Sequence, residues 1–260
     1  MKNDTVVVAG LNDAATATAI RFFRAGIPVI LWAVEEAPPD LFMHRNFGNL
    51  PVLGRKERLG VTARTFADYG YHIEPTPKSG REFVLRARGD RIIPCLNTRE
   101  ITEVIKNGEN MIFCCTSLSA VPGTGEQVYA VEGCSAPNVR YTVDSTGMVL
   151  YPFLELDAGM APFPENMVLT APEEGVVQTL KSIGDKIRRG EPLLQVGRHK
   201  VSAGGDGVVC GMVASGSFVE KGTAVGMIAE KAVNIERLPV ESWAVAGAFL
   251  ELYYYEKKLK

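Results

Sequence analysis

The chain has 260 residues, a formal net charge of −2 and 46% hydrophobic residues, so it is long enough for one large globular domain or two ordinary ones. The balanced charge contains no basic excess, and we expect no nucleic-acid partner. No apolar run approaches the ~20 residues that span a bilayer, and the first residues lead straight into a strand-like run. We therefore expect a cytoplasmic protein without a signal peptide or a membrane partner. The five scattered cysteines lack a CxxC spacing, which favours reduced thiols over a disulfide framework or a zinc site.

The beginning of the chain predicts a β-α-β unit. Thr5–Ala9 is a continuous apolar run typical of a buried strand, Asp13–Ala25 has apolar residues at helical spacing, and Val29–Trp32 resembles the first run. Such a unit implies parallel strands joined by a right-handed crossover. We therefore expect residues 1–160 to form a Rossmann-like α/β domain.

The turn after the first strand stands where the dinucleotide-binding fingerprint G-x-G-x-x-G/A would lie. Gly10 supplies the first glycine and Ala15 the last small residue, whereas Asn12 replaces the middle glycine that lets a pyrophosphate approach the backbone. Asn12 or Asp13 would cap the helix that follows. Glu35 follows the second strand, where a ribose-binding acid belongs. These five residues form a candidate nucleotide site, and the alternative is an inherited scaffold that has lost its cofactor.

The chain is rich in loop residues from 37 to 60 and then alternates short elements. We expect strands at Glu82–Arg86, Ile92–Leu96, Met111–Cys115, Val128–Val131 and Tyr141–Val143, and a helix at Thr98–Asn107. The vicinal Cys114 and Cys115 are expected to be buried strand residues, with a redox or metal-sensing pair as the alternative. The small polar loop after them contains Ser117 and Gly123. Loops in this position bind ligands in α/β sheets, so both residues join the candidate site, with a plain surface loop as the alternative.

A stretch with glycine and prolines at 156–166 marks the expected domain boundary, and the chain after it contains one pattern twice. At an offset of 32 residues the two copies align Ala171 with Ala203, Gly175 with Gly207, Gly184 with Gly216, Gly190 with Gly222 and Val196 with Ile228. Glycine turns at strand-like spacing predict a small all-β domain over 166–230. With only two copies, we expect two interlocked halves that share one core.

The stretch TAPEEG…IGDKIRRGEPLL…VSAGGDG…SGSFVEKGTAVGMI resembles the biotinyl/lipoyl-type hammerhead domain, a barrel-sandwich hybrid. In carrier versions of that domain, a hairpin between the halves presents a lysine that is covalently modified. Here the connection is only Gly197–Lys200, without a protruding hairpin. Lys200 is therefore expected to be a solvated charge, no biotin or lipoate is expected, and the module is interpreted as a non-carrier docking or structural domain.

The chain ends in a predicted helix. Pro239 stands at its favoured first-turn position, Trp243, Phe249 and Leu252 contribute an apolar face, and the last residues are basic. Such an apolar face is stable only when it is buried against another part of the protein or against a partner. We expect residues 236–260 to pack on another domain of the chain or on a partner, which leaves open a homo-oligomer formed through this helix.

The order of these parts resembles the YqeB family. The matching stretches are AGLNDAATATAIRFFRAG at Ala9–Gly26, Asp157–Pro162, the repeat, and Val245–Leu252. This resemblance implies an accessory protein of a selenium-dependent molybdenum hydroxylase system, with a client enzyme as its protein partner. The family pattern begins with a GxGD turn, and here Asn12 replaces the second glycine.

Three functions are compatible with these features. The first is an accessory, maturation or docking protein of a selenium- or molybdenum-dependent enzyme system that carries no swinging prosthetic group. The second is a nucleotide-dependent oxidoreductase with a degenerate dinucleotide turn, and the third is a structural subunit of a larger enzyme complex. Because no nucleophile–base set or metal cluster stands out in the sequence, we assign no catalytic or metal-ligating residue. The cofactor is left open, with a nucleotide as the candidate.

Overall fold

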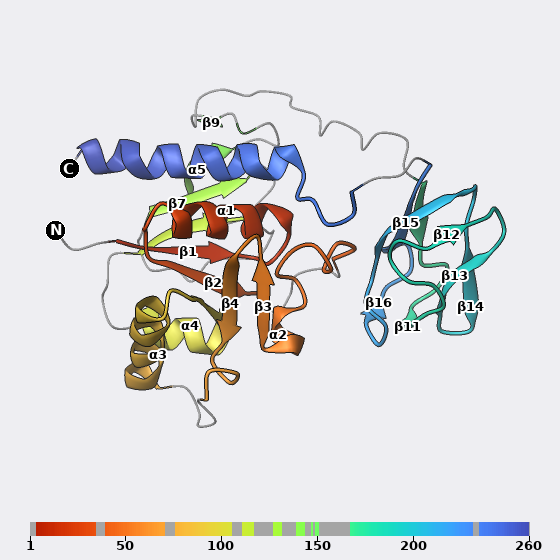
Figure 1. The fold of residues 1–260 in the computed structure, drawn as a ribbon, viewed down its shortest axis with the longest axis horizontal. Coiled ribbons are helices and arrows are strands. Elements are labelled where there is room, and N and C mark those ends of the chain that lie inside the picture. Colours follow the sequence, from red (N-terminus) through yellow and green to blue (C-terminus); the bar gives the residue numbers. More distant parts are fainter. Residues whose placement is uncertain are drawn as a thin grey trace. The chain divides into compact units, whose positions relative to one another are not determined.

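Figure 1 shows the fold in a computed structural model. The structure describes residues 4–34, 40–70, 76–105, 111–116, 127–131, 139–143, 147, 149–150, 167–230 and 234–259. Its contacts divide the chain into two compact units. The first unit comprises residues 1–37, 46–159 and 238–260, and the second comprises residues 38–45 and 160–237.

The first unit is built on one large sheet. Its strands are β1 (Thr5–Ala9), β2 (Val29–Ala33), β3 (Arg55–Arg58), β4 (Val61–Thr65), β5 (Ile93–Asn97), β6 (Met111–Cys115), β7 (Gln127–Val131), β8 (Val139–Val143) and β9 (Val149–Leu150). They lie in the order β3-β4-β5-β2-β1-β6-β7-β8-β9. Neighbours from β4 to β8 are parallel, and the outer pairs β3/β4 and β8/β9 are antiparallel. The prediction of an α/β fold with a large parallel sheet is therefore confirmed.

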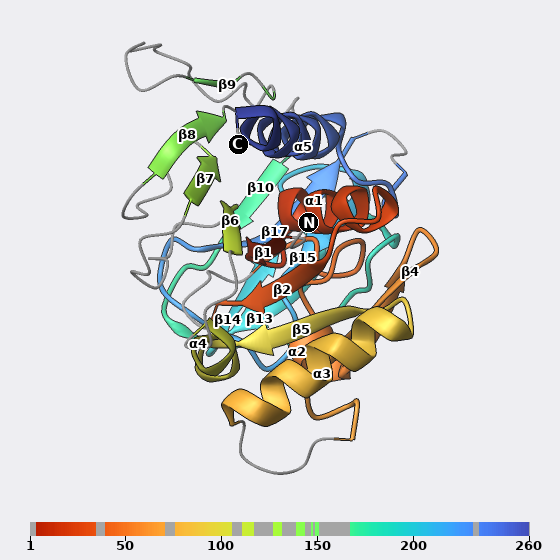
Figure 2. The same cartoon turned by 90° about the vertical axis from the view of Figure 1, so that its left-hand side faces the viewer.

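Helices cover both faces of this sheet (Figure 2). They are α1 (Asp13–Arg24), α2 (Leu50–Leu53), α3 (Pro77–Gly89), α4 (Thr98–Ile105) and α5 (Val240–Leu259). Helices α1 and α5 contribute to the apolar cluster on one face, and α3 and α4 to the cluster on the other. Of the helices that the structure describes, none is long and apolar enough to span a bilayer.

The vicinal cysteines of β6 point to opposite faces of the sheet. Cys114 lies in the cluster with α1 and α5, and Cys115 lies in the cluster with α3 and α4, because successive side chains of a strand alternate. Both side chains are fully buried, and burial raises the pKa of the Cys114 thiol. The two thiols therefore pack in two separate cores, which disfavours a redox or metal-sensing pair.

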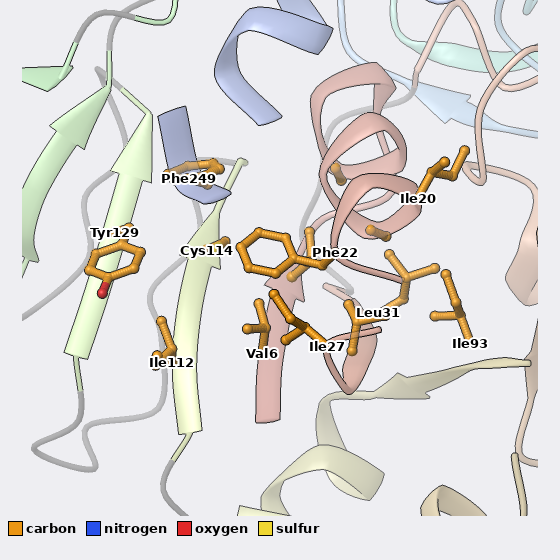
Figure 3. Close-up of a cluster of buried hydrophobic side chains, with 14 of the residues drawn as sticks. Val6, Ile20, Phe22, Ile27, Leu31, Ile93, Ile112, Cys114, Tyr129 and Phe249 are labelled. Carbon is orange, nitrogen blue, oxygen red and sulfur yellow. The ribbon is translucent and has the colours of Figure 1, made fainter. Parts of the chain in front are cut away.

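Helix α5 packs against α1 within the first unit. Phe249, Leu252 and Tyr253 are buried in the cluster that contains Phe22 of α1. The rings of Phe22 and Tyr253 meet edge to face with their centroids 5.7 Å apart. Figure 3 shows Phe22 and Phe249 in this cluster. The end of the chain thus completes the core around the first helix.

The strand predicted at Glu82–Arg86 is wrong, because this segment belongs to helix α3. The helix begins with a capping box in which Thr76 and Ser79 each accept a hydrogen bond from the backbone N–H of the other. Its apolar stripe consists of Phe83 and Ala87, which are fully buried and lie four residues apart. Val84 and Leu85 directly follow Phe83, and this continuous apolar run obscures the helical period in the sequence.

The second unit contains two four-stranded sheets. Its strands are β10 (Met167–Thr170), β11 (Gly175–Thr179), β12 (Lys186–Ile187), β13 (Pro192–Val196), β14 (His199–Ser202), β15 (Gly207–Met212), β16 (Phe218–Val219) and β17 (Ala224–Ala229). One sheet has the order β10-β17-β15-β12 and the other β14-β13-β11-β16. Each strand of the first sheet has its counterpart, 32 residues away in the sequence, at the same place in the second sheet. Each sheet thus contains two strands from each half, and the halves enclose one apolar core.

Glycines that coincide in the repeat occupy equivalent turns. The N–H of Gly184 donates to the carbonyl oxygen of Val209, and the N–H of Gly216 donates to that of Val177, each at 2.8 Å. Their φ angles are +92° and +90°, in the left-handed region that a side chain strains. The repeated glycine therefore fixes the same turn in both halves.

A short segment from the loop-rich stretch also belongs to the second unit. Leu41 is buried in its core, and the Leu41 carbonyl oxygen accepts a hydrogen bond from the N–H of Met212 at 2.8 Å. Phe42 packs directly over Gly211, where an added Cβ would lie 2.9 Å from the ring. Residues far apart in sequence therefore build the second core together.

Candidate functional site

The predicted nucleotide turn lies at the carboxyl end of β1, near the centre of the sheet. From β1 the chain continues to β2 on one side, and it later returns to β6 on the other side. Ligands of open α/β sheets bind in the crevice where the strand order reverses in this way. Gly10 ends β1 with a φ angle of +114°, so the first glycine of the fingerprint has the conformation that only glycine adopts readily.

Asn12 connects the two strand ends at this point. Its side-chain Oδ1 accepts a hydrogen bond from the N–H of Ala15 at 2.9 Å and caps α1. Its Nδ2 donates to the carbonyl oxygen of Thr116 at 2.8 Å. Thr116 directly follows β6, and it donates its N–H and its hydroxyl to the carbonyl oxygen of Ala9, at 3.0 and 2.9 Å. We call this set of contacts the Asn12 bridge.

The first turn of α1 makes further polar contacts. The amide Nδ2 of Asn46 donates to the Asp13 carboxylate at 3.1 Å, and Asn46 is fully buried. The hydroxyl of Thr16 accepts a hydrogen bond from the N–H of Phe47 at 2.9 Å. The chain segment around residue 46 therefore covers the start of the helix.

The structure brings four of the seven predicted site residues together. Gly10, Asn12, Asp13 and Ala15 form the turn and the first helical turn, with Ala15 fully buried. The remaining three, Glu35, Ser117 and Gly123, lie outside the described residues.

Two further residues at this turn, Thr116 and Asn46, were not predicted from the sequence. Thr116 directly follows the predicted strand MIFCC, so its position at a strand end made it detectable. No sequence pattern marks Asn46, which reaches the turn from a loop-rich stretch.

The Asn12 bridge opposes phosphate binding at the turn. A phosphate on the N-terminus of α1 would need the place of the Asn12 amide, because the backbone N–H of Ala15 is already bonded. Each of the two side-chain hydrogen bonds stabilises the fold by about 0.5–1.5 kcal/mol. Breaking both lowers the affinity for a nucleotide by roughly 5- to 150-fold.

Polar groups at the neighbouring strand end β5 are also engaged by the protein. Glu100 accepts a hydrogen bond from the N–H of Asn97, and the Asn97 side chain accepts one from the N–H of Glu100, both at 2.8 Å. Burial raises the pKa of the Glu100 carboxyl. In the part of the chain that the structure describes, no group of three or more His, Cys, Asp or Glu side chains is placed to hold a metal ion.

The connection between the two halves of the second unit is a tight hairpin. Val196 pairs with His199, so Gly197 and Arg198 form a two-residue turn between β13 and β14. Gly197 has a φ angle of +56°. Lys200 lies beyond the turn as an exposed residue of the ladder.

Glu173 holds this hairpin from an adjacent turn. Its Oε1 accepts a hydrogen bond from the N–H of Arg198 at 2.9 Å and lies 2.8 Å from Nδ1 of His199. The hydrogen bond with the His199 ring, and then the one with the Arg198 backbone, hold the pKa of the Glu173 carboxyl below its usual range. A charged carboxylate therefore stabilises the hairpin.

The fold and the turn define an α/β protein with an open, largely parallel sheet. At the turn where related folds bind phosphate, the side chain of Asn12 bonds to the backbone of Ala15 and Thr116. No family model matches the chain. The chain is similar to the uncharacterized protein YqeB of Escherichia coli K12, with 23% identity over 253 residues and 95% of this chain covered. It spans 46% of the length of that relative. This similarity supports the resemblance to the YqeB family.

Among solved structures, the chain is similar to an aspartoacylase family protein from Mesorhizobium loti. The two share 11% sequence identity, and the match covers 90% of this chain and 54% of that chain. The TM-score is 0.24, which is too low to indicate a common fold.

Proposed function

We propose that the chain is an accessory or docking protein of a selenium- or molybdenum-dependent enzyme system that carries no swinging prosthetic group. The resemblance to the YqeB family suggests the enzyme system, and the similarity to YqeB of Escherichia coli supports that resemblance. The observation that carries the docking function is the Asn12 bridge. In a nucleotide-dependent enzyme of this architecture, the phosphates would bind at this turn, and here the Asn12 side chain fills that position.

The strand order supports a Rossmann-like assignment for the first unit. Six of the seven parallel strands lie in the order β5-β2-β1-β6-β7-β8, and β4 lies beyond β5. Numbered along the chain, this is the 3-2-1-4-5-6 order of dinucleotide-binding folds, with β3 and β4 inserted before the third strand. We infer that the unit descends from such a fold and now acts as a scaffold.

The second unit supports a hammerhead-like module that is not a carrier. Its two sheets exchange strands between the halves of the repeat, as expected for two interlocked halves. Lys200 is opposite Gln195 in the β13/β14 ladder and does not stand at the tip of the turn. A ligase that modifies an exposed turn lysine would find Gly197 and Arg198 in that place.

A nucleotide-dependent oxidoreductase is the second candidate. Gly10 keeps its left-handed conformation, and the strand order reverses beside it, so the crevice retains the backbone of a nucleotide site. This function requires the Asn12 side chain to swing away from Thr116 when the ligand enters. A structural subunit of a larger enzyme complex would leave the bridge closed.

Calorimetric titration of NAD⁺, NADP⁺ and ATP into the wild-type protein and the Asn12→Gly variant distinguishes the oxidoreductase from the two functions that leave the bridge closed. We expect no binding to the wild type at nucleotide concentrations of about 1 mM, and measurable binding to Asn12→Gly if the amide alone closes the site. Asn12→Asp keeps the helix cap but repels phosphates, so it should not bind. Thr76→Gly removes the cap of α3 instead and serves as the matched control. Micromolar binding to the wild type would overturn the scaffold assignment.

A further inference from the structure

A cavity of about 220 Å³ lies at the amino ends of β1, β2 and β5, the edge of the sheet opposite to the Asn12 bridge. Its walls are largely apolar and include Phe23, Val29 and Ile92. Arg88 and Arg91, at the end of α3, also line it. The cavity lies below the ~300–1,000 Å³ of pockets for drug-sized ligands, so it suits a small molecule.

No residue that the structure describes neutralises either arginine of the cavity. Within the described ranges, the guanidinium groups of Arg88 and Arg91 have no hydrogen-bond or ion-pair partner. Two nearby carboxylates are engaged elsewhere: Asp90 accepts a hydrogen bond from the Tyr69 hydroxyl, and Asp4 lies 3.3 Å from the Lys257 ammonium. The two guanidinium groups are therefore available to an anion, which arginine binds with its planar fork of N–H donors.

Thr5 adds a polar group to the cavity. Its relative exposure is only 5%, and it lines the cavity at the start of β1. Its hydroxyl has no hydrogen-bond partner among the residues that the structure describes. Within the described residues, this hydroxyl is therefore available to a ligand atom in the cavity.

Arg91 also has an unusual backbone conformation. Its φ angle is +55°, and among the described residues only Leu59 shares a positive φ without being glycine. The N–H of Ile92 donates to the carbonyl oxygen of Ala87 at 2.8 Å, which closes α3 with a motif that usually contains glycine at the Arg91 position. Glycine would adopt this φ angle with less strain, so we infer that the arginine side chain has a function other than capping the helix.

The charge at the cavity favours a single negative charge on the ligand. Helices α1 and α3 both end there, and each helix C-terminus contributes about −0.5 charge. The two guanidinium groups contribute about +2, which leaves about +1 near the cavity. A monoanion is therefore matched, whereas a dianion would be opposed by the helix ends.

We propose that this cavity binds a small monocarboxylate with a compact apolar body. The carboxylate contacts Arg88 and Arg91, the apolar body packs on the walls, and the Thr5 hydroxyl bonds a polar atom of the ligand or its water. This site is independent of the Asn12 bridge and of the proposed docking function.

Benzoate is a suitable probe, with neutral benzamide and inorganic phosphate as comparisons. We expect benzoate to bind the wild type with a dissociation constant of about 0.1–1 mM and to raise Tm, as a ligand of the native state does. Arg88→Gln should weaken binding at least about tenfold. Arg91→Gly should weaken it as much and yet raise Tm by about 1–4 °C without ligand, because glycine relieves the strained φ.

Leu59→Gly is the matched control, because it relieves the other positive φ and Leu59 does not line the cavity. It should also raise Tm and leave benzoate binding unchanged. The proposal would be overturned if benzoate failed to bind the wild type at about 10 mM. Equal binding of benzamide, stronger binding of inorganic phosphate, or undiminished binding by Arg91→Gly would also overturn it.

Discussion

At the scale of single residues, Asn12 makes two different contacts with its side-chain amide. The oxygen caps helix α1, and the nitrogen donates a hydrogen bond to the residue that follows strand β6. The cap satisfies the N–H of Ala15, and the bond to Thr116 joins the ends of β1 and β6. Both partners are backbone atoms, so the identity of the residue at position 116 matters less than the presence of an amide at position 12. Aspartate would keep the cap but lose the donor.

Asn12→Ala should lower the free energy of unfolding by about 1–3.5 kcal/mol. The lost cap contributes about 0.5–2 kcal/mol and the lost bond to Thr116 about 0.5–1.5 kcal/mol. Asn12→Asp should show an intermediate loss. Urea denaturation measures both, and a loss within about 0.5 kcal/mol for Asn12→Ala, typical of a surface substitution, would count against the bridge.

Glu173 predicts a dependence of the β13/β14 hairpin on pH. Its folded-state pKa is lowered, mainly by the hydrogen bond with His199 and then by the Arg198 N–H. Stabilisation by a carboxylate with a lowered pKa is complete above the unfolded pKa and is lost as the pH falls through the folded pKa. We expect the NMR shift of the Arg198 amide proton to titrate with a midpoint below about 4.3, the usual glutamate value.

The variant Glu173→Gln should abolish this titration, because glutamine carries no ionisable carboxyl. The Arg198 amide donates to Glu173 and not to the neighbouring Glu174, so Glu174→Gln should leave the titration of that amide in place. A midpoint at or above the usual value would show that the carboxylate does not hold the hairpin in solution.

At the scale of elements, the pair α1 and α5 closes one face of the large sheet. Phe249→Ala should destabilise the first unit by about 3–5 kcal/mol, because a fully buried ring leaves a cavity when it is removed. Tyr255→Ala on the same helix should cost less than about 1 kcal/mol, since Tyr255 is 46% exposed. Similar losses in both variants, measured by urea unfolding, would show that α5 does not pack on α1.

Sequence patterns predicted the elements that have strong apolar runs. The runs at β1, β2 and β6 are continuous because both faces of a central parallel strand are buried. Strand β3 has the charged sequence RKER with alternating exposure, so only its ladder to β4 identifies it. Helix α3 was mistaken for a strand because Phe83, Val84 and Leu85 form a short continuous apolar run, which is also typical of a strand.

The candidate site was predictable in position but not in detail. The fingerprint placed Gly10 and Asn12 at the end of β1, since local sequence determines that turn. The contact of Asn12 with Thr116 spans 104 residues, and the contact of Asp13 with Asn46 spans 33. Such pairs depend on how the sheet and loops assemble, and single-sequence periodicity carries no information about them.

At the scale of the whole molecule, each of the two units builds its apolar core from segments that are far apart in sequence. Leu41 comes from the N-terminal half and is buried with residues of the repeat, while Phe249 comes from the C-terminal end and is buried with α1. A fragment cut at the repeat boundaries would therefore lack Leu41. This arrangement makes the segment around Leu41 part of the second unit.

Leu41→Ala should destabilise the second unit selectively, by about 2–4 kcal/mol for a nearly buried leucine. Hydrogen exchange should increase in peptides from β15 and β17 and remain unchanged in β1 and β6. Leu53→Ala is the control, because Leu53 is 55% exposed. Increased exchange in β1 and β6 instead would place Leu41 in the wrong core.

Native mass spectrometry of the protein purified gently from its own host tests the proposed function most directly. We expect the chain in a fixed stoichiometry with a larger enzyme, molybdenum or selenium in the same sample by elemental analysis, and no nucleotide mass on the chain. A nucleotide mass that is released when the chain unfolds would contradict the proposal, because the Asn12 bridge would then open in the native protein.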